Sequence, residues 1–133
     1  MDHQHSVVVL DDCEIDQFFA RRAIDETPWF DEVEQFVDPR EALAFFVSKR
    51  LNGSDKSVDL LLLDFRMPHM NGVQFLEQIK SCKLGQLINS VAVMMTVPLL
   101  QCDAQAFKKL HPDLHFVAKP LGRDAIGSAI GVH

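Results

Sequence analysis

Five short apolar runs, separated by segments of helical spacing, constrain the fold of this chain more than any other feature. The runs lie at 6–10, 33–37, 58–63, 91–95 and 115–118. Strands that alternate with helices in this way are typical of α/β domains with a parallel sheet. Three of the runs are apolar throughout rather than alternating, as expected of strands with helices packed on both faces. We therefore predict an α/β fold with a doubly wound, five-stranded parallel sheet.

The segments between and after these runs have the spacing of amphipathic helices. They lie at 14–24, 39–49, 73–81, 98–110 and 121–132. In the first segment, four apolar side chains share one face: Ile15, Phe18, Phe19 and Ala23. The last segment is the weakest helix prediction, because three glycines lie in it and glycine disfavours helix.

Length and composition place the chain in one ordinary domain. It has 133 residues, of which 47% are hydrophobic, and we expect 1–133 to form a single domain with an N-terminal tail at 1–5. No apolar run approaches the roughly 18 residues that a membrane helix needs. The start "MDHQHSVVVLDD" has neither the basic segment nor the long apolar segment of a secretory signal. A cytoplasmic protein without a membrane partner is the resulting expectation.

The net charge and the spacing of the cysteines and histidines argue against a nucleic-acid-binding protein and against a zinc protein. The formal net charge is −6, whereas a nucleic-acid-binding face needs a basic patch or stripe. The paired cations at 21–22, 49–50 and 108–109 are interpreted as solvated helix faces. The three cysteines and six histidines show no metal-ligand spacing. We expect no nucleic-acid partner and no zinc site.

Four of the apolar runs end directly in polar residues. Asp11 and Asp12 follow the first run, Asp64 the third, Thr96 the fourth and Lys119 the fifth. Because parallel strands end at the same edge of a sheet, these groups converge there. Ligands of open α/β sheets bind at that edge, where the crossovers change face. The sequence thus predicts a site with three carboxylates, one hydroxyl and one ammonium.

Such a cluster suits phosphoryl chemistry. Three neighbouring carboxylates repel one another, and Mg²⁺ is the cation that favours a few carboxylates together with phosphate oxygens. A carboxylate can attack phosphorus to form an acyl phosphate, supported by a metal and a fixed cation. Asp64 is the predicted nucleophile. Singly, Asp11 or Asp12 is also a plausible helix cap and Thr96 a turn residue, so the prediction rests on the four strand ends together.

The motifs resemble a known family, the receiver domains of two-component response regulators. The resemblance runs from residue 7 to about 130 and is carried by "VVVLDD", "LLLDFRMPHMNGVQFLEQIK", "VAVMMTV" and "FVAKP". It implies a flavodoxin-like receiver fold, with strands in the order 2-1-3-4-5 and five helices.

The resemblance also implies a role for each site residue. Asp64 would accept a phosphoryl group from a sensor histidine kinase, and Lys119 would contact that group. Asp12 would bind Mg²⁺ directly and Asp11 mainly through water. Asp64 and the backbone carbonyl of Arg66 would complete the protein ligands.

A switch and three departures from the family pattern are part of the same expectation. Thr96 would move toward the phosphoryl group, and Phe116 would move inward with it. The peptide bond before Pro120 would be cis. Phe116 is commonly Tyr in the family, and Val97 stands where Ala or Gly is usual, which leads to the hypothesis that Val97 alters the phosphoryl lifetime. Arg66 lies near the pocket mouth, and we favour a solvated guanidinium over one paired with phosphate.

The expected function is that of a stand-alone response regulator, a phosphoacceptor rather than an enzyme. It would signal by a phosphorylation-dependent protein contact, or pass the phosphoryl group to a histidine phosphotransfer protein in a phosphorelay; the sequence does not separate these. The contact face would be the fourth helix, fifth strand and fifth helix. It would include Leu99, Leu100, Ala106, Phe107 and Phe116, although core packing is the preferred interpretation for Phe107.

Three rival functions use similar features. A phosphatase of the haloacid dehalogenase type needs a second Asp two residues after the nucleophile, where this chain has Arg66. A flavodoxin-like cofactor site needs a loop rich in Ser, Thr and Gly after the first strand, where this chain has "DDCEID". A phosphorylation-independent interaction module on the same fold is the remaining alternative. The complete set of Asp64, Thr96 and Lys119 with the acidic pair argues against it.

Overall fold

A parallel five-stranded sheet forms the centre of the molecule in the computed structural model, which describes residues 5–53 and 56–131. The strand order in these residues is β2-β1-β3-β4-β5, with every neighbouring pair parallel. The strands are β1 (His5–Leu10), β2 (Phe30–Phe36), β3 (Val58–Asp64), β4 (Ile88–Met95) and β5 (Leu114–Ala118). The predicted fold class and strand order are confirmed.

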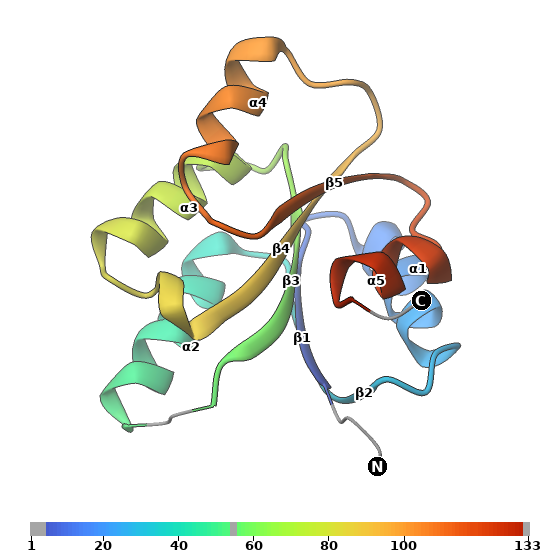
Figure 1. Cartoon of the computed structure of the whole chain (residues 1–133), viewed down its shortest axis with the longest axis horizontal. Coiled ribbons are helices and arrows are strands. Elements are labelled where there is room, and N and C mark those ends of the chain that lie inside the picture. Colours follow the sequence, from blue (N-terminus) through green and yellow to red (C-terminus); the bar gives the residue numbers. More distant parts are fainter. Residues whose placement is uncertain (1–4, 54–55, 132–133) are drawn as a thin grey trace.

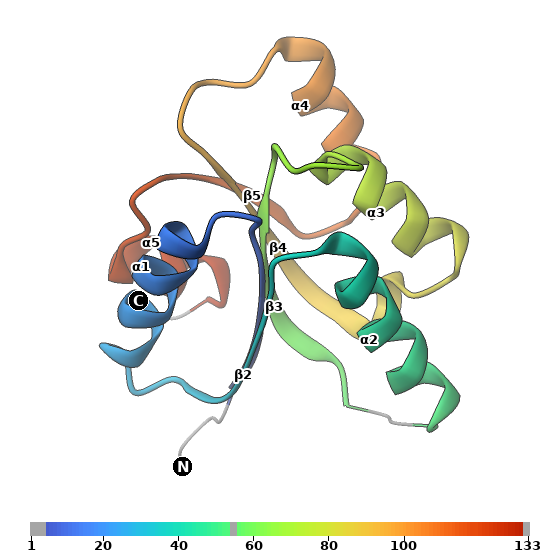
Figure 2. The same ribbon diagram turned by 180° about the vertical axis from the view of Figure 1, so that it is seen from behind.

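Helices connect the strands and cover both faces of the sheet. They are α1 (Glu14–Asp25), α2 (Pro39–Leu51), α3 (Gly72–Ser81), α4 (Gln101–Lys108) and α5 (Arg123–Ala129), with a 3₁₀ turn η1 (Gly85–Leu87) before β4. Helices α1 and α5 lie on one face and α2, α3 and α4 on the other (Figure 1, Figure 2). None of these helices is long and apolar enough to cross a membrane.

The central strands are apolar throughout because each face of the sheet has its own core. In β3, Leu60 and Leu62 pack in the core beneath α1 and α5. Leu61 and Leu63 pack in the core beneath α2, α3 and α4. All four side chains are fully buried. Two-sided burial therefore explains the runs of apolar residues without alternation.

Helix α1 turns a different face to the sheet than its apolar spacing suggests. Three of the large side chains expected to share a face are exposed by 46% or more: Ile15, Phe18 and Phe19. The buried residues are Gln17, Ala20, Ala23 and Ile24. The small side chains of Ala20 and Ala23 leave little bulk between the helix and the sheet. The prediction that the apolar residues of α1 form its buried face was therefore wrong, except for Ala23.

Several element boundaries also differ from the sequence expectation. Strand β2 begins at Phe30 rather than 33, and His5 belongs to β1 rather than to a tail, pairing with Phe30. Helix α4 is shorter than the predicted segment 98–110, because the chain is still extended at Leu100 (φ −64°, ψ 150°). Helix α5 is likewise shorter than 121–132. Residues 1–4 and 132 lie outside the described residues.

The loop after β3 is held in place by the start of α3. Asn71 and Gln74 form a reciprocal capping box, with both bonds at 2.9 Å. The backbone N–H of Gly72 donates to the carbonyl of Phe65 at 2.8 Å. A Cβ at Gly72 would lie 3.1 Å from the Phe107 ring and 3.3 Å from the Asp64 carbonyl oxygen. The Asn-Gly pair therefore fixes the loop that leaves Asp64.

Candidate functional site

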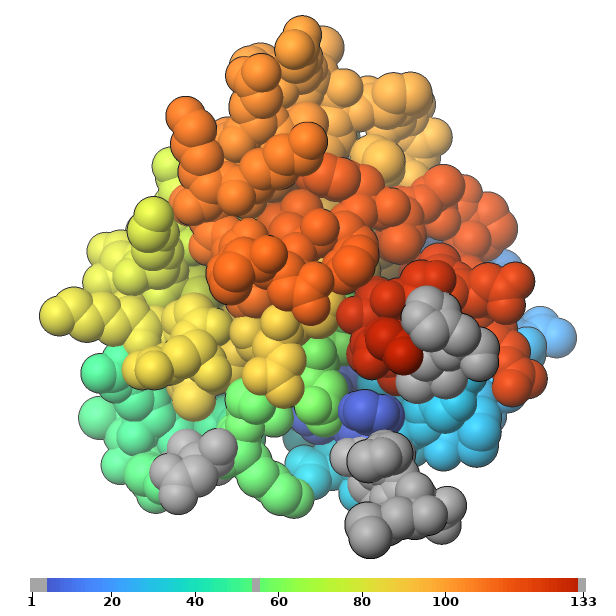
Figure 3. Space-filling model, in the orientation of Figure 1, coloured from blue at the N-terminus to red at the C-terminus, as the bar shows by residue number. Residues whose placement is uncertain are grey.

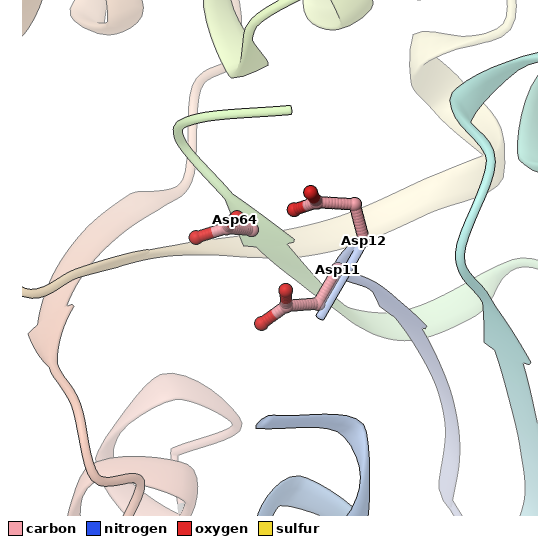
Figure 4. Close-up of side chains that lie close together, drawn as sticks. All are labelled: Asp11, Asp12 and Asp64. Carbon is pink, nitrogen blue, oxygen red and sulfur yellow. The ribbon is translucent and has the colours of Figure 1, made fainter. Parts of the chain in front are cut away.

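Three carboxylates meet at the C-terminal edge of the sheet. Asp11 and Asp12 follow β1, and Asp64 is the last residue of β3 (Figure 4). One oxygen of each can be chosen so that all three lie within 4.8 Å of one another. Asp11 and Asp64 are 1% and 8% exposed, while Asp12 is open to solvent. The neighbouring parallel strands β1 and β3 bring the three together, as the sequence predicts.

A single ammonium neutralises part of this negative charge. Lys119 follows β5, and its Nζ lies 2.8 Å from Asp11 Oδ2, 3.0 Å from Asp64 Oδ1 and 2.7 Å from Asp16 Oδ2. The three N–H groups of the ammonium thus match three carboxylates. The peptide bond between Lys119 and Pro120 is cis. The lysine side chain is mostly buried, so these contacts are little screened by solvent.

Burial shifts the protonation of the site. Burial raises the pKa of Asp64 to about 6, opposed by Lys119 and reinforced by the charges of Asp11 and Asp12. Burial also raises the pKa of Asp11, against the hydrogen bonds from Lys119 and the Cys13 backbone. Although burial disfavours its charged form, hydrogen bonds to Asp11, Asp16 and Asp64 hold the pKa of Lys119 above its ordinary value. The cluster therefore carries excess negative charge that a cation would stabilise.

An open cavity of about 370 Å³ gives access to this cluster. Its lining includes Asp12, Asp64, Arg66, Thr96 and Lys119, so five of the predicted site residues share one space. The structure places Asp11 just beneath, in contact with Lys119.

Part of the cavity lining is apolar. Val97 and Leu100, in the segment between β4 and α4, line it and are 54% and 70% exposed. Thr96 precedes them and is also exposed. The predicted hydroxyl group therefore lies at the cavity with an accessible apolar surface beside it.

Phe116 lies away from the cavity, among other aromatic rings. Its ring is 5.9 Å from that of Phe107, edge to face, and Phe107 is 5.8 Å from Phe65, the residue after Asp64. Phe107 is fully buried. Phe107 is therefore part of the core and does not belong to an exposed contact face. Core packing was the interpretation preferred for this residue from the sequence.

Two residues of α1 belong to the site although the sequence analysis did not identify them. Asp16 contacts Lys119; its position one turn after Asp12 could have indicated this. Gln17 is buried, and its Nε2 donates to the carbonyls of Asp11 (3.0 Å) and Phe36 (2.7 Å). A glutamine within a helix is usually exposed, so no sequence signal pointed to Gln17.

The donor set fits Mg²⁺ better than a soft metal. Every group in the acidic cluster is an oxygen donor, two of the three carboxylates are buried, and none of the described histidines or cysteines joins the cluster. Hard oxygen ligands with an open side are what Mg²⁺ prefers, because it keeps several waters. The residues present therefore suit a magnesium ion.

Comparison with known proteins shows the family of the chain. The model of the response regulator receiver domain family matches residues 7–131. The chain belongs to this family. Receiver domains are phosphoacceptor signalling modules of two-component systems, phosphorylated on an aspartate and generally binding Mg²⁺ at an acidic pocket. They interact with histidine kinases and with downstream targets.

Solved structures share the fold at low sequence identity. A two-component response regulator from Cytophaga hutchinsonii has a TM-score of 0.79 at 20% identity, covering 98% of this chain and 96% of its own. The chemotaxis protein CheY4 of Vibrio cholerae has a TM-score of 0.70 at 20% identity, covering 98% of both chains. The receiver domain of the histidine kinase CKI1 from Arabidopsis thaliana, complexed with Mg²⁺, has a TM-score of 0.75 at 22% identity, covering 92% of this chain and 88% of its own.

A curated relative matches only part of the chain. It is a protein-glutamate methylesterase/protein-glutamine glutaminase of Treponema pallidum, 36% identical over 73 residues. The match covers 50% of this chain and 16% of that relative. This receiver domain thus corresponds to a small part of that longer protein.

Proposed function

We propose that Asp64 is the phosphoacceptor of this receiver domain and takes its phosphoryl group from a phosphohistidine in a Mg²⁺-dependent reaction. The observation that carries the proposal is the position of Asp64, in ion-pair contact with Lys119 and grouped with Asp11 and Asp12 in an open cavity. The donor would be a sensor histidine kinase or a histidine phosphotransfer protein.

Asp64, Lys119 and Thr96 would have different roles in the reaction. An ionised oxygen of Asp64 attacks phosphorus, the P–N bond of the donor breaks as the new P–O bond forms, and Asp64 becomes an acyl phosphate. Lys119 then turns an N–H from the Asp64 carboxylate to a phosphoryl oxygen. The hydroxyl of Thr96 donates to another phosphoryl oxygen as it moves across the cavity.

Metal binding falls to the acidic residues. Asp12, Asp64 and the backbone carbonyl of Arg66 would hold Mg²⁺ directly, with Asp11 acting mainly through water. When bound, the ion neutralises charge that develops on the phosphoryl oxygens. The two buried carboxylates and the raised pKa of Asp64 support this assignment, because they leave negative charge to be compensated.

The exposed face of α1 suits a protein donor. Ile15, Phe18 and Phe19 are large apolar side chains on the solvent side of the helix that begins beside Asp12. Grouped apolar side chains on a surface mark contact sites. We propose that the donor docks there with its phosphohistidine directed toward Asp64.

The output would pass through the face formed by α4, β5 and α5. Phe116 on β5 packs against Phe107 of α4, so inward movement of its ring would alter the packing of both elements. The altered face would bind a downstream protein; return of the phosphoryl group to a second histidine would be the phosphorelay route. Regulation through a bistable packing element of this kind is how local charge changes reach a surface.

Chemical trapping tests the assignment of Asp64. After incubation with acetyl phosphate and Mg²⁺, sodium borohydride reduces an acyl phosphate on aspartate to homoserine, which peptide mapping locates. We expect homoserine at position 64 and nowhere else. An Asp31→Asn variant, changed at an exposed acid of β2, is the control and should label normally. Homoserine at position 11 or 12 instead, or none in the folded protein, would contradict the proposal; the latter would favour a phosphorylation-independent interaction module.

A further inference from the structure

A second surface feature lies at the opposite edge of the sheet from the carboxylates. It is a groove of about 770 Å³ where α3 and α4 end and β4 begins. Its lining holds four of the seven lysines of the chain: Lys80, Lys83, Lys108 and Lys109. In Figure 3 the yellow turn after α3 lies beside the orange segment that ends α4. Cations that are far apart in sequence are therefore gathered by the fold into one basic groove.

The charge of the basic groove is of one sign. Its lining contains no Asp or Glu, and the structure gives none of its four lysines an ion pair within the described residues. A fifth cation lies close by, since Arg50 at the end of α2 donates to the carbonyls of Cys82 and Lys83. These cations stand against 19 acidic residues in a chain of net charge −6. Such a local excess of one charge favours a ligand of the opposite charge.

Lys83 occupies a backbone position that favours glycine. Its φ is +58°, in the left-handed region that costs an ordinary side chain some free energy. Its N–H bonds the Lys80 carbonyl, and the N–H of Leu84 bonds that of Ile79, which is the usual geometry after a helix that ends in glycine. The backbone conformation at this position therefore does not account for the presence of a lysine there.

Part of the lining of the basic groove is apolar and suits an apolar side chain of a peptide. Buried Ile88, half-buried Leu110 and exposed Pro112 line it beneath the lysines. No Phe, Tyr or Trp is part of the lining, so the stacking surface that single-stranded nucleic acids use is missing. A long polyanion would also extend beyond the groove over an acidic molecule. An acidic peptide with one apolar side chain fits both the rim and the floor.

We propose that the basic groove is a docking site for an acidic polypeptide segment of a partner protein. Carboxylates of the segment pair with the four lysines, and an apolar side chain of the segment rests on Leu110 and Pro112. The groove lies where β4 begins, whereas the phosphoacceptor site lies where β4 ends. This contact is therefore separate from phosphoryl transfer and does not depend on the proposed function.

Fluorescence anisotropy of the full chain with a labelled polyglutamate peptide carrying one central leucine tests the proposal. We expect saturable binding that weakens with salt. The K80E/K109E double variant should bind at least about tenfold more weakly, since both changes reverse a rim charge. The control is R21E/R22E, which makes the same charge change on α1, across the sheet. It should bind within about twofold of the parent, because screening limits the reach of distant charges.

Circular dichroism and urea denaturation verify that each variant is folded. If K80E/K109E does not fold, Lys83→Gly, which suits the left-handed backbone there, takes its place with a smaller expected loss of peptide binding. Absence of peptide binding by the parent, or an equal loss in R21E/R22E, would overturn the proposal. Tighter binding of an oligothymidine or of phosphatidylglycerol vesicles than of the peptide would overturn it as well, in favour of a nucleic acid or a membrane surface.

Discussion

Lys119 is the residue on which the electrostatics of the site depend. Its ammonium is shared by Asp11, Asp16 and Asp64 at 2.7–3.0 Å. The ammonium therefore already lies beside Asp64, so under the proposed function one of its hydrogen bonds would change partner as charge develops. The excess of carboxylates over cations makes the resting site electrostatically unfavourable.

Asp64→Asn should stabilise the metal-free fold at neutral pH. The pKa of Asp64 is raised from 3.8 to about 6, so the folded state binds the proton more tightly than the unfolded state does. The stability due to protonated Asp64 is present below the unfolded pKa and is lost as the pH rises through about 6. We expect Asp64→Asn to raise the free energy of unfolding at pH 7 by about 1–2 kcal/mol, measured by urea denaturation in EDTA.

The pH dependence supplies the control for this prediction. Near pH 4 most of the gain should disappear, because Asp64 of the parent is then largely protonated in the folded state. A gain of the same size at both pH values would contradict the electrostatic explanation.

Val97→Ala should shorten the lifetime of the phosphorylated form. Val97 lines the cavity wall beside the exposed Thr96, where a smaller side chain gives water more room to attack the acyl phosphate. We expect hydrolysis to accelerate about twofold to fivefold, which corresponds to less than about 1 kcal/mol of barrier. Decay of the phosphorylated mass after removal of the donor measures the rate. Val37→Ala, at an exposed site between β2 and α2, is the control; an unchanged rate in Val97→Ala would refute the hypothesis.

Lys83→Gly should increase stability. The residue lies at φ +58°, and glycine adopts this region without the penalty of a Cβ. We expect a gain of about 0.5–1 kcal/mol in the free energy of unfolding. Lys80→Gly, inside the last turn of α3, should instead cost up to about 1 kcal/mol. Equal effects of the two substitutions in urea denaturation would show that the left-handed backbone is not the cause.

At the level of elements, α1 has two faces of different composition. Its inner face carries Gln17, which bonds the carbonyls at the ends of β1 and β2, and Asp16, which contacts Lys119. Its outer face carries the apolar group of Phe18 and its neighbours. Under the proposed function, docking of a donor would account for the three large apolar side chains that this helix exposes.

Phe18→Asp should slow phosphoryl transfer from a protein donor but not from a small-molecule donor. It places a charge in the proposed docking face, so transfer from a phosphorylated histidine phosphotransfer domain should slow at least about tenfold. Labelling by acetyl phosphate, which needs no docking face, should change little. Leu51→Asp, at an exposed apolar residue that ends α2, is the control and should leave both rates unchanged. Equal slowing with both donors would mean that Phe18 acts on the site itself.

The elements also show how far the sequence determines the fold. The apolar runs predicted the parallel sheet, and the residues that end them predicted Asp11, Asp12, Asp64 and Lys119 as neighbours, because strand ends are local in sequence and meet at one edge. The buried face of α1 was not predictable from apolar spacing, since Gln17 satisfies backbone carbonyls there. Contacts between elements, such as Asp16 with Lys119, depend on the packing distance of α1 and left only a weak signal.

The same limit applies to the basic groove. Lys80 and Lys83 belong to α3 and the turn after it, while Lys108 ends α4 and Lys109 follows it. From the sequence alone, each of these lysines is interpreted as a solvated cation at a helix end, where lysine is common. Only the parallel packing of α3 beside α4 brings the four together.

Across the whole molecule, the two surfaces lie at opposite edges of one sheet. Helix α4 spans the distance between them: Leu100 just before it lines the cavity beside Asp64, and Lys108 at its end lines the basic groove. Any displacement of α4 would change both surfaces. The receiver fold thus offers a candidate phosphoacceptor site and a candidate docking groove without overlap of their residues.

Intact-protein mass spectrometry after incubation with acetyl phosphate tests the central claim most directly. We predict the gain of a single phosphoryl group in the presence of Mg²⁺, lost on mild alkaline treatment, and no gain in EDTA or in Asp64→Asn. A folded parent protein that gains no mass with Mg²⁺, or an Asp64→Asn variant that gains as much as the parent, would contradict the assignment of Asp64 as a Mg²⁺-dependent phosphoacceptor.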